Sequence, residues 1–290
     1  WTSKFTWSYV KNKVLKLPDN GRDKNRIGGI TLADGTAFGG TAEGEPLYRY
    51  YGYVVDHIIE TQEQADNAMY DSSAKGYRPS DGKNIAGRKE IGDYEWKNRE
   101  GSQTKDGKDY IDSQDQFLLG YTVPHSTGGL NNNFTYKNFT LNIFLDWALG
   151  HSINNNSEMR YFMNTFANNY TLIDEVKQCW KQPGDNTKYA RFTANDPDGN
   201  ANFSRTSNVF NYKGDYLCIR EISLQYNVPT NKLTKLGIQN LAITLAGNNL
   251  HYFTAVKGVS PEVGASTTYN KDYYNYPPIR KYSVGVKVTF

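Results

Sequence analysis

The chain has 290 residues, of which 33 are Lys or Arg and 30 are Asp or Glu, giving a formal charge of +3. No run of 18 apolar residues occurs, which excludes a transmembrane helix, and the balanced charge argues against a dedicated nucleic-acid binder. A polar average composition does not exclude a transmembrane β-barrel, because the strands of such a barrel present side chains to lipid only at every second position.

Strict alternation of apolar and polar residues is the strongest signal along the chain and predicts β-strands. The alternating runs cover residues 1–9, 128–136, 138–147, 215–226, 238–248 and 281–290. Two pairs of these runs predict antiparallel neighbours, 128–136 with 138–147 and 215–226 with 238–248. The last run places five residues on one apolar face: Tyr282, Val284, Val286, Val288 and Phe290.

The connections between these strands are uneven in length. Lys137-Asn138 is a short turn, whereas 148–214 is a long polar connection, and the Gly- and charge-rich segments 18–46 and 77–109 are interpreted as loops. Short turns on one side and long loops on the other are typical of an outer-membrane barrel, and aromatic residues at the strand ends fit interfacial girdles. A β-sandwich is the alternative, since it too buries one apolar face of each sheet.

Two short helices are expected inside the loops. Thr61-Gln-Glu-Gln64 matches a capping box and predicts a helical stretch to about Met69. Helical spacing over 172–180, ended by Pro183 and Gly184, predicts the second.

No pattern of catalytic residues stands out, so the sequence predicts neither an enzyme nor a bound cofactor. Cys179 and Cys218 lack metal-ligand spacing and are interpreted as unpaired thiols. A tyrosine cluster in the last long loop is a candidate surface for stacking a sugar or peptide, or for packing against a lid protein; its alternative role is self-packing within the loop. The cluster comprises Tyr269, Tyr273, Tyr274 and Tyr276.

Several segments, in order along the chain, resemble the SusC/RagA-like TonB-dependent outer-membrane transporters. The most specific are Gly214–Pro229, Leu236–Leu241, Ala246–Leu250, Gly258–Val263, Tyr276–Arg280 and the terminal Val-Gly-Val-Lys-Val-Thr-Phe290. Weaker matches upstream include 52–62, 92–97, 111–115, 120–124 and 180–183. The resemblance therefore covers essentially the whole chain, but only the last third of a complete family member.

The resemblance implies an all-β fold: about eight C-terminal strands of a 22-stranded transmembrane antiparallel barrel with long extracellular loops. Residues 1–290 would be the C-terminal part of the barrel domain, with the plug domain absent from this chain. The implied function is nutrient import, of glycans or oligopeptides, across the outer membrane of a Gram-negative bacterium. The implied partners are a SusD-like surface lipoprotein, TonB acting through the missing N-terminal region, the remaining barrel and plug, outer-membrane lipid and a second transporter in a dimer.

Two features of the resemblance concern sites. The terminal strand, Tyr282 to Phe290, is expected to close the barrel, because an unpaired strand edge in lipid is costly. The family often has a loop resembling a calcium site, but Asp106, Asp112 and Asp115 lack a clean ligand spacing here, so no metal is predicted. Two alternatives stay open: a complete small barrel acting as a passive pore or structural protein, and a soluble β-sandwich that binds glycans.

Overall fold

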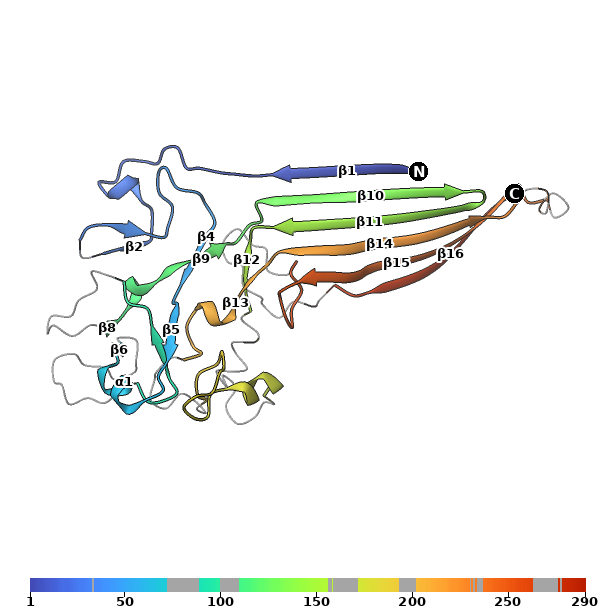
Figure 1. Ribbon diagram of the computed structural model, residues 1–290. Coiled ribbons are helices and arrows are strands. Elements are labelled where there is room, and N and C mark those ends of the chain that lie inside the picture. Colours follow the sequence, from blue (N-terminus) through green and yellow to red (C-terminus); the bar gives the residue numbers. More distant parts are fainter. Residues whose placement is uncertain are drawn as a thin grey trace.

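The computed structural model describes residues 1–32, 34–71, 89–99, 110–155, 158, 172–192, 202–229, 231, 233, 237–262, 276 and 278–290. Within these residues the chain forms one long sheet and a body of shorter elements at one end of it (Figure 1). None of the helices in the described ranges is long and apolar enough to cross a membrane.

The long sheet has six strands in the order β1-β10-β11-β14-β15-β16, and every neighbouring pair is antiparallel. The strands are β1 Thr2–Tyr9, β10 Ser126–Tyr136, β11 Phe139–Leu149, β14 Tyr216–Asn227, β15 Asn240–Thr254 and β16 Lys281–Thr289. Both predicted strand pairs are confirmed. The described residues supply six strands to this sheet, compared with the eight or so that were expected.

The tight turn between β10 and β11 follows from local chemistry. Tyr136 pairs with Phe139, so only Lys137 and Asn138 connect the two strands, and Lys137 adopts a positive φ of 51°. The Asn138 side chain donates a 2.8 Å hydrogen bond to the carbonyl of Asn227, which fixes the turn against β14. This turn and both ends of the chain lie at the end of the sheet away from the other elements (Figure 1).

The long connections are folded into a separate unit, the loop body, at the opposite end of the sheet. Its described residues form ten short strands in two-stranded sheets: β2 Ile30–Thr31, β3 Ala37–Phe38, β4 Arg49–Gly52, β5 Val55–Ile58, β6 Tyr70–Asp71, β7 Tyr94–Trp96, β8 Tyr110–Ile111, β9 Phe117–Tyr121, β12 Ser152–Asn154 and β13 Asn211–Lys213. The helices are α1 Gln62–Asn67 and the 3₁₀ turns η1 Asp23–Asn25, η2 Ser113–Asp115, η4 Asp174–Gln178 and η5 Asn208–Phe210.

The predicted helix near residue 61 is confirmed with its capping box, since the Thr61 hydroxyl accepts from the backbone of Gln64 and the Gln64 side chain accepts from Thr61 in return. The second predicted helix is wrong in extent and type. Residues 172–180 form only the 3₁₀ turn Asp174–Gln178, because the apolar residues there are used in tertiary packing: Ile173 and Val176 pack on a core that includes Cys179.

The loop body has its own hydrophobic core, which the interpretation of 18–46 and 77–109 as loops did not anticipate. Tyr94, Trp96 and Phe210 are almost completely buried in it, together with Ile111, Cys179, Tyr189, Ala190, Phe203 and Val209. Burial of each large aromatic side chain contributes about 2–3 kcal/mol of transfer free energy. The described segments that carry these residues are therefore a folded unit.

Gly92 shows how closely this core is packed. Its φ is +94°, and a Cβ at this position would overlap the Trp180 ring. Only glycine satisfies both constraints, so Gly92 allows residues 89–96 to pack directly on the segment around Trp180.

Candidate functional site

One face of the six-stranded sheet is apolar and exposed across its whole width. Phe5, Leu245 and Val284, from three different strands, are 63%, 52% and 73% exposed. Residues directly opposite in the register lie on the same face, so the cross-strand pairs extend this surface over all six strands. Its exposed members are Trp1, Phe5, Trp7, Tyr9, Phe134, Tyr136, Phe139, Leu149, Leu217, Leu224, Ile243, Leu245, Phe253, Tyr282, Val284, Val286 and Val288.

A contiguous apolar surface of this extent is far larger than soluble monomers present to water. The strands are also long enough for a membrane, since about 9–11 tilted residues cross the hydrocarbon layer and β10, β11, β14 and β15 have 11, 11, 12 and 15 residues. This face therefore has the chemistry and the dimensions of a lipid-facing wall.

The opposite face of the sheet is polar. Thr6, Asn131, Asn142 and Glu221 come from four neighbouring strands and line a shallow hollow of about 400 Å³ together with Lys4, Gly129 and Phe144. Alternation of this kind, apolar on one side and polar on the other, is the arrangement of a barrel wall between lipid and a water-filled interior.

A β-bulge puts a cation on this polar face. Arg220 has no partner in the register with either β11 or β15, and the ladders resume at Glu221. Its guanidinium makes a bidentate contact with Asp146 at 2.8 and 2.7 Å and also bonds Glu262, which lies in the segment after β15. The side-chain oxygen of Asn249 and the Tyr252 hydroxyl accept further bonds at 2.8 and 3.1 Å. Arg220 thus connects two strands of the wall to the segment that follows β15.

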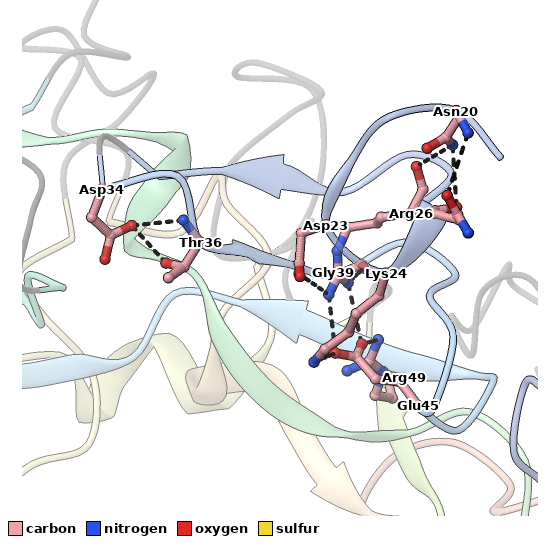
Figure 2. Close-up of polar contacts among 10 residues, drawn as sticks. Asn20, Asp23, Lys24, Arg26, Asp34, Thr36, Gly39, Glu45 and Arg49 are labelled. Atoms are coloured by element: carbon pink, nitrogen blue, oxygen red, sulfur yellow. Dashed lines mark hydrogen bonds and ion pairs between the residues drawn. The ribbon is translucent and has the colours of Figure 1, made fainter.

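In the loop body, a second ion cluster is built around one carboxylate, Glu45 (Figure 2). Arg26, which is 2% exposed, donates to its two oxygens at 3.0 and 3.2 Å, Lys24 donates at 3.0 Å, and Arg49 forms a further ion pair. Burial alone raises the pKa of Glu45, but the bonds from Arg26 and Lys24 and the charge of Arg49 outweigh it and lower the pKa from 4.5 to about 2.

The same cluster borders a hollow of about 440 Å³. Arg26 also donates to the Gly39 carbonyl at 2.5 Å, and both Gly39 and Arg49 line the hollow. This glycine hollow is further lined by Gly29, Ile30, Phe38, Gly40, Tyr50, Tyr51, Tyr53, Gln116 and Thr206. Glu45 therefore holds together two sides of a concave, tyrosine-rich surface.

A second and larger hollow, of about 580 Å³, lies where β13 meets the segments around residues 155, 188 and 257. On one side, Glu158 accepts hydrogen bonds from the hydroxyls of Tyr189 and Tyr212 at 2.8 and 2.7 Å and from the Asn155 amide at 3.1 Å. Burial and the neighbouring carboxylate raise the pKa of both phenols, so both are protonated donors at neutral pH. We call this site the tyrosine–glutamate hollow.

The residues predicted as sites from sequence are placed as follows. Tyr269, Tyr273 and Tyr274 lie outside the described residues, and Tyr276 is 83% exposed. Tyr282, Val284, Val286 and Val288 lie on the apolar face of β16, with Phe290 just beyond it. In the described sheet β16 pairs with β15 and β1 pairs with β10, so the pairing expected to close a barrel stays a prediction.

The acidic residues considered for calcium have other partners. Asp106 lies outside the described residues. Asp112 and Asp115 cap η2: Asp112 accepts from the Gln114 backbone at 2.6 Å, and Asp115 accepts from the backbones of Asp112 and Arg99, each at 2.8 Å. No cluster of His, Cys, Asp or Glu in the described ranges has the geometry of a metal site.

Both cysteines are buried and unpaired, which confirms the expected free thiols. Burial raises the pKa of Cys179 to about 12. A thiol in this environment has a structural role in the core of the loop body rather than a reactive one.

Sequence reasoning missed Arg220, Glu45 and the Tyr189–Tyr212–Glu158 group as site residues. A signal did exist for Arg220, because Arg220 and Glu221 are two successive polar residues inside an alternating run, as expected at a bulge. The other groups come from segments that are distant in sequence or have no periodicity, so their proximity depends on how the loops fold.

An antiparallel sheet with one lipid-compatible face, one polar face and a folded loop body at one end has the arrangement of the wall of a transmembrane β-barrel. No protein-family model matches the chain. The chain is similar to two curated relatives from Formosa agariphila over its whole length. TonB-dependent receptor P3 is 27% identical over 300 aligned residues, and TonB-dependent receptor P39 is 26% identical over 308. The chain spans 27% and 28% of the length of these two relatives.

Solved structures of the RagAB peptide transporter share the fold. One matches 99% of this chain with a TM-score of 0.65 at 18% identity, and its open-open state matches with a TM-score of 0.59 at 16% identity; the matched part is 27% and 26% of those chains. The expected resemblance to TonB-dependent outer-membrane transporters and the expected antiparallel all-β fold are thereby confirmed, and closure into a barrel stays a prediction. The named relatives are receptors, and the solved structures are those of a transporter.

Proposed function

We propose that residues 1–290 form part of the barrel wall and extracellular mouth of a TonB-dependent importer of nutrients, either glycans or oligopeptides. The observation that carries this proposal is the six-stranded antiparallel sheet with an exposed apolar face and a polar face. Lipid requires the first face and an aqueous path requires the second. The similarity to TonB-dependent receptors over the whole chain supports the same assignment.

The rest of the barrel is supplied by strands other than these six. In the described sheet each of β1 and β16 has one neighbour, which leaves a row of backbone N–H and C=O groups along each edge. An unsatisfied backbone group in hydrocarbon costs several kcal/mol, so both edges need partners in a membrane. We assign those partners, and the plug domain, to the remainder of the receptor.

The place of the loop body at one end of the sheet supports a role as a docking platform at the barrel mouth. Its core and ion clusters hold together the segments that line its two hollows. A SusD-like lipoprotein lid would close over this surface with nutrient between lid, plug and wall. TonB would act on the plug through the N-terminal region, and two such transporters would form the dimeric assembly.

The test is deletion of the gene for the complete receptor. The deletion strain is then complemented with the wild-type gene or with a gene that lacks only the plug domain. Uptake of labelled oligosaccharide and oligopeptide pools is measured in strains with and without TonB. We expect loss of uptake of one pool on deletion and dependence of that uptake on TonB. Unchanged uptake of both pools, or uptake that persists without TonB, contradicts the proposal.

The lid is tested separately by purifying the affinity-tagged receptor from detergent-solubilised outer membranes. A surface lipoprotein should copurify with it. Extraction also addresses the alternatives: release in plain buffer without detergent would favour a soluble sandwich, and TonB-independent flux would favour a passive pore. The sandwich would require a second sheet over the apolar face, and that face is exposed in the described residues.

A further inference from the structure

We propose that the tyrosine–glutamate hollow is a subsite for a carboxylate of the imported ligand, which binds between the ammonium groups of Lys188 and Lys257. This inference rests on the proposed import function and specifies the ligand chemistry at one position of the mouth. The pairing of the charged groups around the hollow supports this subsite.

The carboxylate of Glu158 is already satisfied by the protein. Its oxygens accept from two phenols and one amide, and its own backbone N–H bonds the Asn155 side chain at 3.0 Å. Glu158 and Tyr189 are 9% and 6% exposed. The floor of the hollow is therefore a closed hydrogen-bond network, and it orients the two tyrosine rings.

Lys188 is held at the mouth by those rings. Its Nζ lies 5.2 Å from the ring centre of Tyr189 and 4.8 Å from that of Tyr212, within cation–π range of both. Its hydrogen bond to the Tyr212 hydroxyl is long, at 3.4 Å. The ammonium is thus positioned by two aromatic faces and one long hydrogen bond, which leaves two of its three N–H donors for a ligand.

Lys257 provides a second cation. Partial burial lowers the pKa of Lys188, attraction to Glu158 raises it and repulsion from Lys257 lowers it, so both charges act on the Lys188 ammonium. Within the described part of the chain, neither lysine has an acidic group within ion-pairing distance. Glu158 attracts Lys188 without pairing with it directly, so two ammonium groups that line the same hollow can donate to an oxyanion.

The hollow is also lined by Glu175, which is exposed. Lys188 and Lys257 are exposed as well, so water and salt screen all three charges, and an anion has to be held by direct contacts with the two ammonium groups. Because the Glu158 carboxylate is already hydrogen-bonded by the protein, the two lysines supply the cationic donors at the mouth.

One short segment, residues 257–262, connects the hollow to the wall of the barrel. The Lys257 carbonyl accepts from the Asn155 amide at 3.0 Å, Gly258 and Val259 line the hollow, and Glu262 binds Arg220 on the polar face. The segment that lines the hollow therefore continues directly to a contact with the polar face of the sheet.

The experiment uses the complete receptor purified in detergent with its lipoprotein. The test variant is Lys188→Gln/Lys257→Gln. The matched control is Lys177→Gln/Lys181→Gln, which removes the same charge from neighbouring lysines that do not line the hollow. Calorimetric titration uses two probe pairs: trigalacturonate against galactotriose, and trialanine against its C-terminal amide.

We expect one carboxylated probe to bind more tightly than its neutral counterpart, and the probe that does so identifies the source of the carboxylate. Loss of the two lysines should weaken that binding about tenfold, because two charge-assisted contacts are lost at a solvent-exposed site. The control variant should stay within about twofold of wild type, and added salt should weaken wild-type binding more than that of the test variant.

The subsite is refuted if neither carboxylated probe binds more tightly than its neutral partner, or if test and control variants lose affinity equally. Uptake by cells is measured in parallel to separate this outcome from failure of the import function. Lysine-dependent binding without import would refute the import function and leave the subsite intact. Import that depends on neither the carboxylate nor the lysines would refute the subsite and leave the import function intact.

Discussion

Replacement of Glu45 by glutamine should loosen the part of the loop body that borders the glycine hollow. The substitution keeps the shape of the side chain but removes the charge that Arg26, Lys24 and Arg49 share. Arg26 is buried and would keep the Gly39 carbonyl and a 3.6 Å contact with Asp23 as partners. A buried cation without its main counter-ion is strongly destabilising.

The magnitude follows from proton linkage. A carboxyl whose pKa falls from 4.5 to about 2 on folding stabilises the folded state by about 3 kcal/mol once pH is above 4.5. Because the folded pKa is the lower one, this contribution decreases as pH falls below 4.5 and is lost near pH 2. At pH 3 less than half of it should be left.

Hydrogen exchange of the complete receptor, followed by mass spectrometry, measures this local stability. At pH 7, peptides covering residues 20–50 should exchange roughly 100-fold faster in Glu45→Gln than in wild type, the equivalent of about 3 kcal/mol. The ratio of variant to wild type should shrink at pH 3. Glu63→Gln is the matched control, since Glu63 is exposed on α1 and lies outside the cluster.

The reasoning would be refuted by exchange within about threefold of wild type in this segment at pH 7. An equal effect at pH 7 and pH 3 would also refute it, because the stabilisation would then not come from the ionised carboxylate. Faster exchange across the whole receptor, including β10 and β11, would indicate global destabilisation instead.

Three further predictions concern the wall and the core. Leu245→Arg, on the apolar face of β15, should destabilise the receptor folded in lipid vesicles by about 2–4 kcal/mol, whereas Thr244→Arg on the polar face should change its stability little. Equal effects of the two substitutions would contradict the assignment of the faces. Arg220→Met should expose the segment after β15 to proteolysis, since Asp146 and Glu262 lose their shared cation at a cost of about 2 kcal/mol; Arg220→Lys should protect it only partly, because a lysine cannot make the bidentate contact. Cys179 should resist maleimide at pH 8 in the folded receptor and react after denaturation, because with a pKa of about 12 only about one thiol in 10,000 is ionised; rapid labelling of the native protein would contradict its burial.

The strands of the wall were predictable because their signal is local. Alternation along residues 281–290 identifies the apolar face of β16 without any knowledge of its neighbour, and the structure confirms that face through pairs such as Val284 with Leu245. The helix start at Thr61 was predictable for the same reason, since both halves of a capping box lie within one turn.

The loop body shows where local signals end. Tyr94 and Trp96 are buried by residues about a hundred positions away, including Phe203 and Phe210, and a three-residue strand has too little periodicity to reveal this. The apolar spacing at 172–180 suggested a helix, but the same residues serve a tertiary core, which overrides local preference.

The sequence by itself thus determined the barrel-like strands, their lipid-facing side and the family that the chain resembles, because a membrane wall must repeat one chemical pattern every two residues. Only the tertiary structure decided which charged and aromatic groups meet. Glu45 with Arg26, Arg220 with Glu262, and Glu158 with Tyr189 and Tyr212 are joined by loop packing and by a bulge. Such contacts depend on the path of the whole chain and leave no periodic trace in sequence.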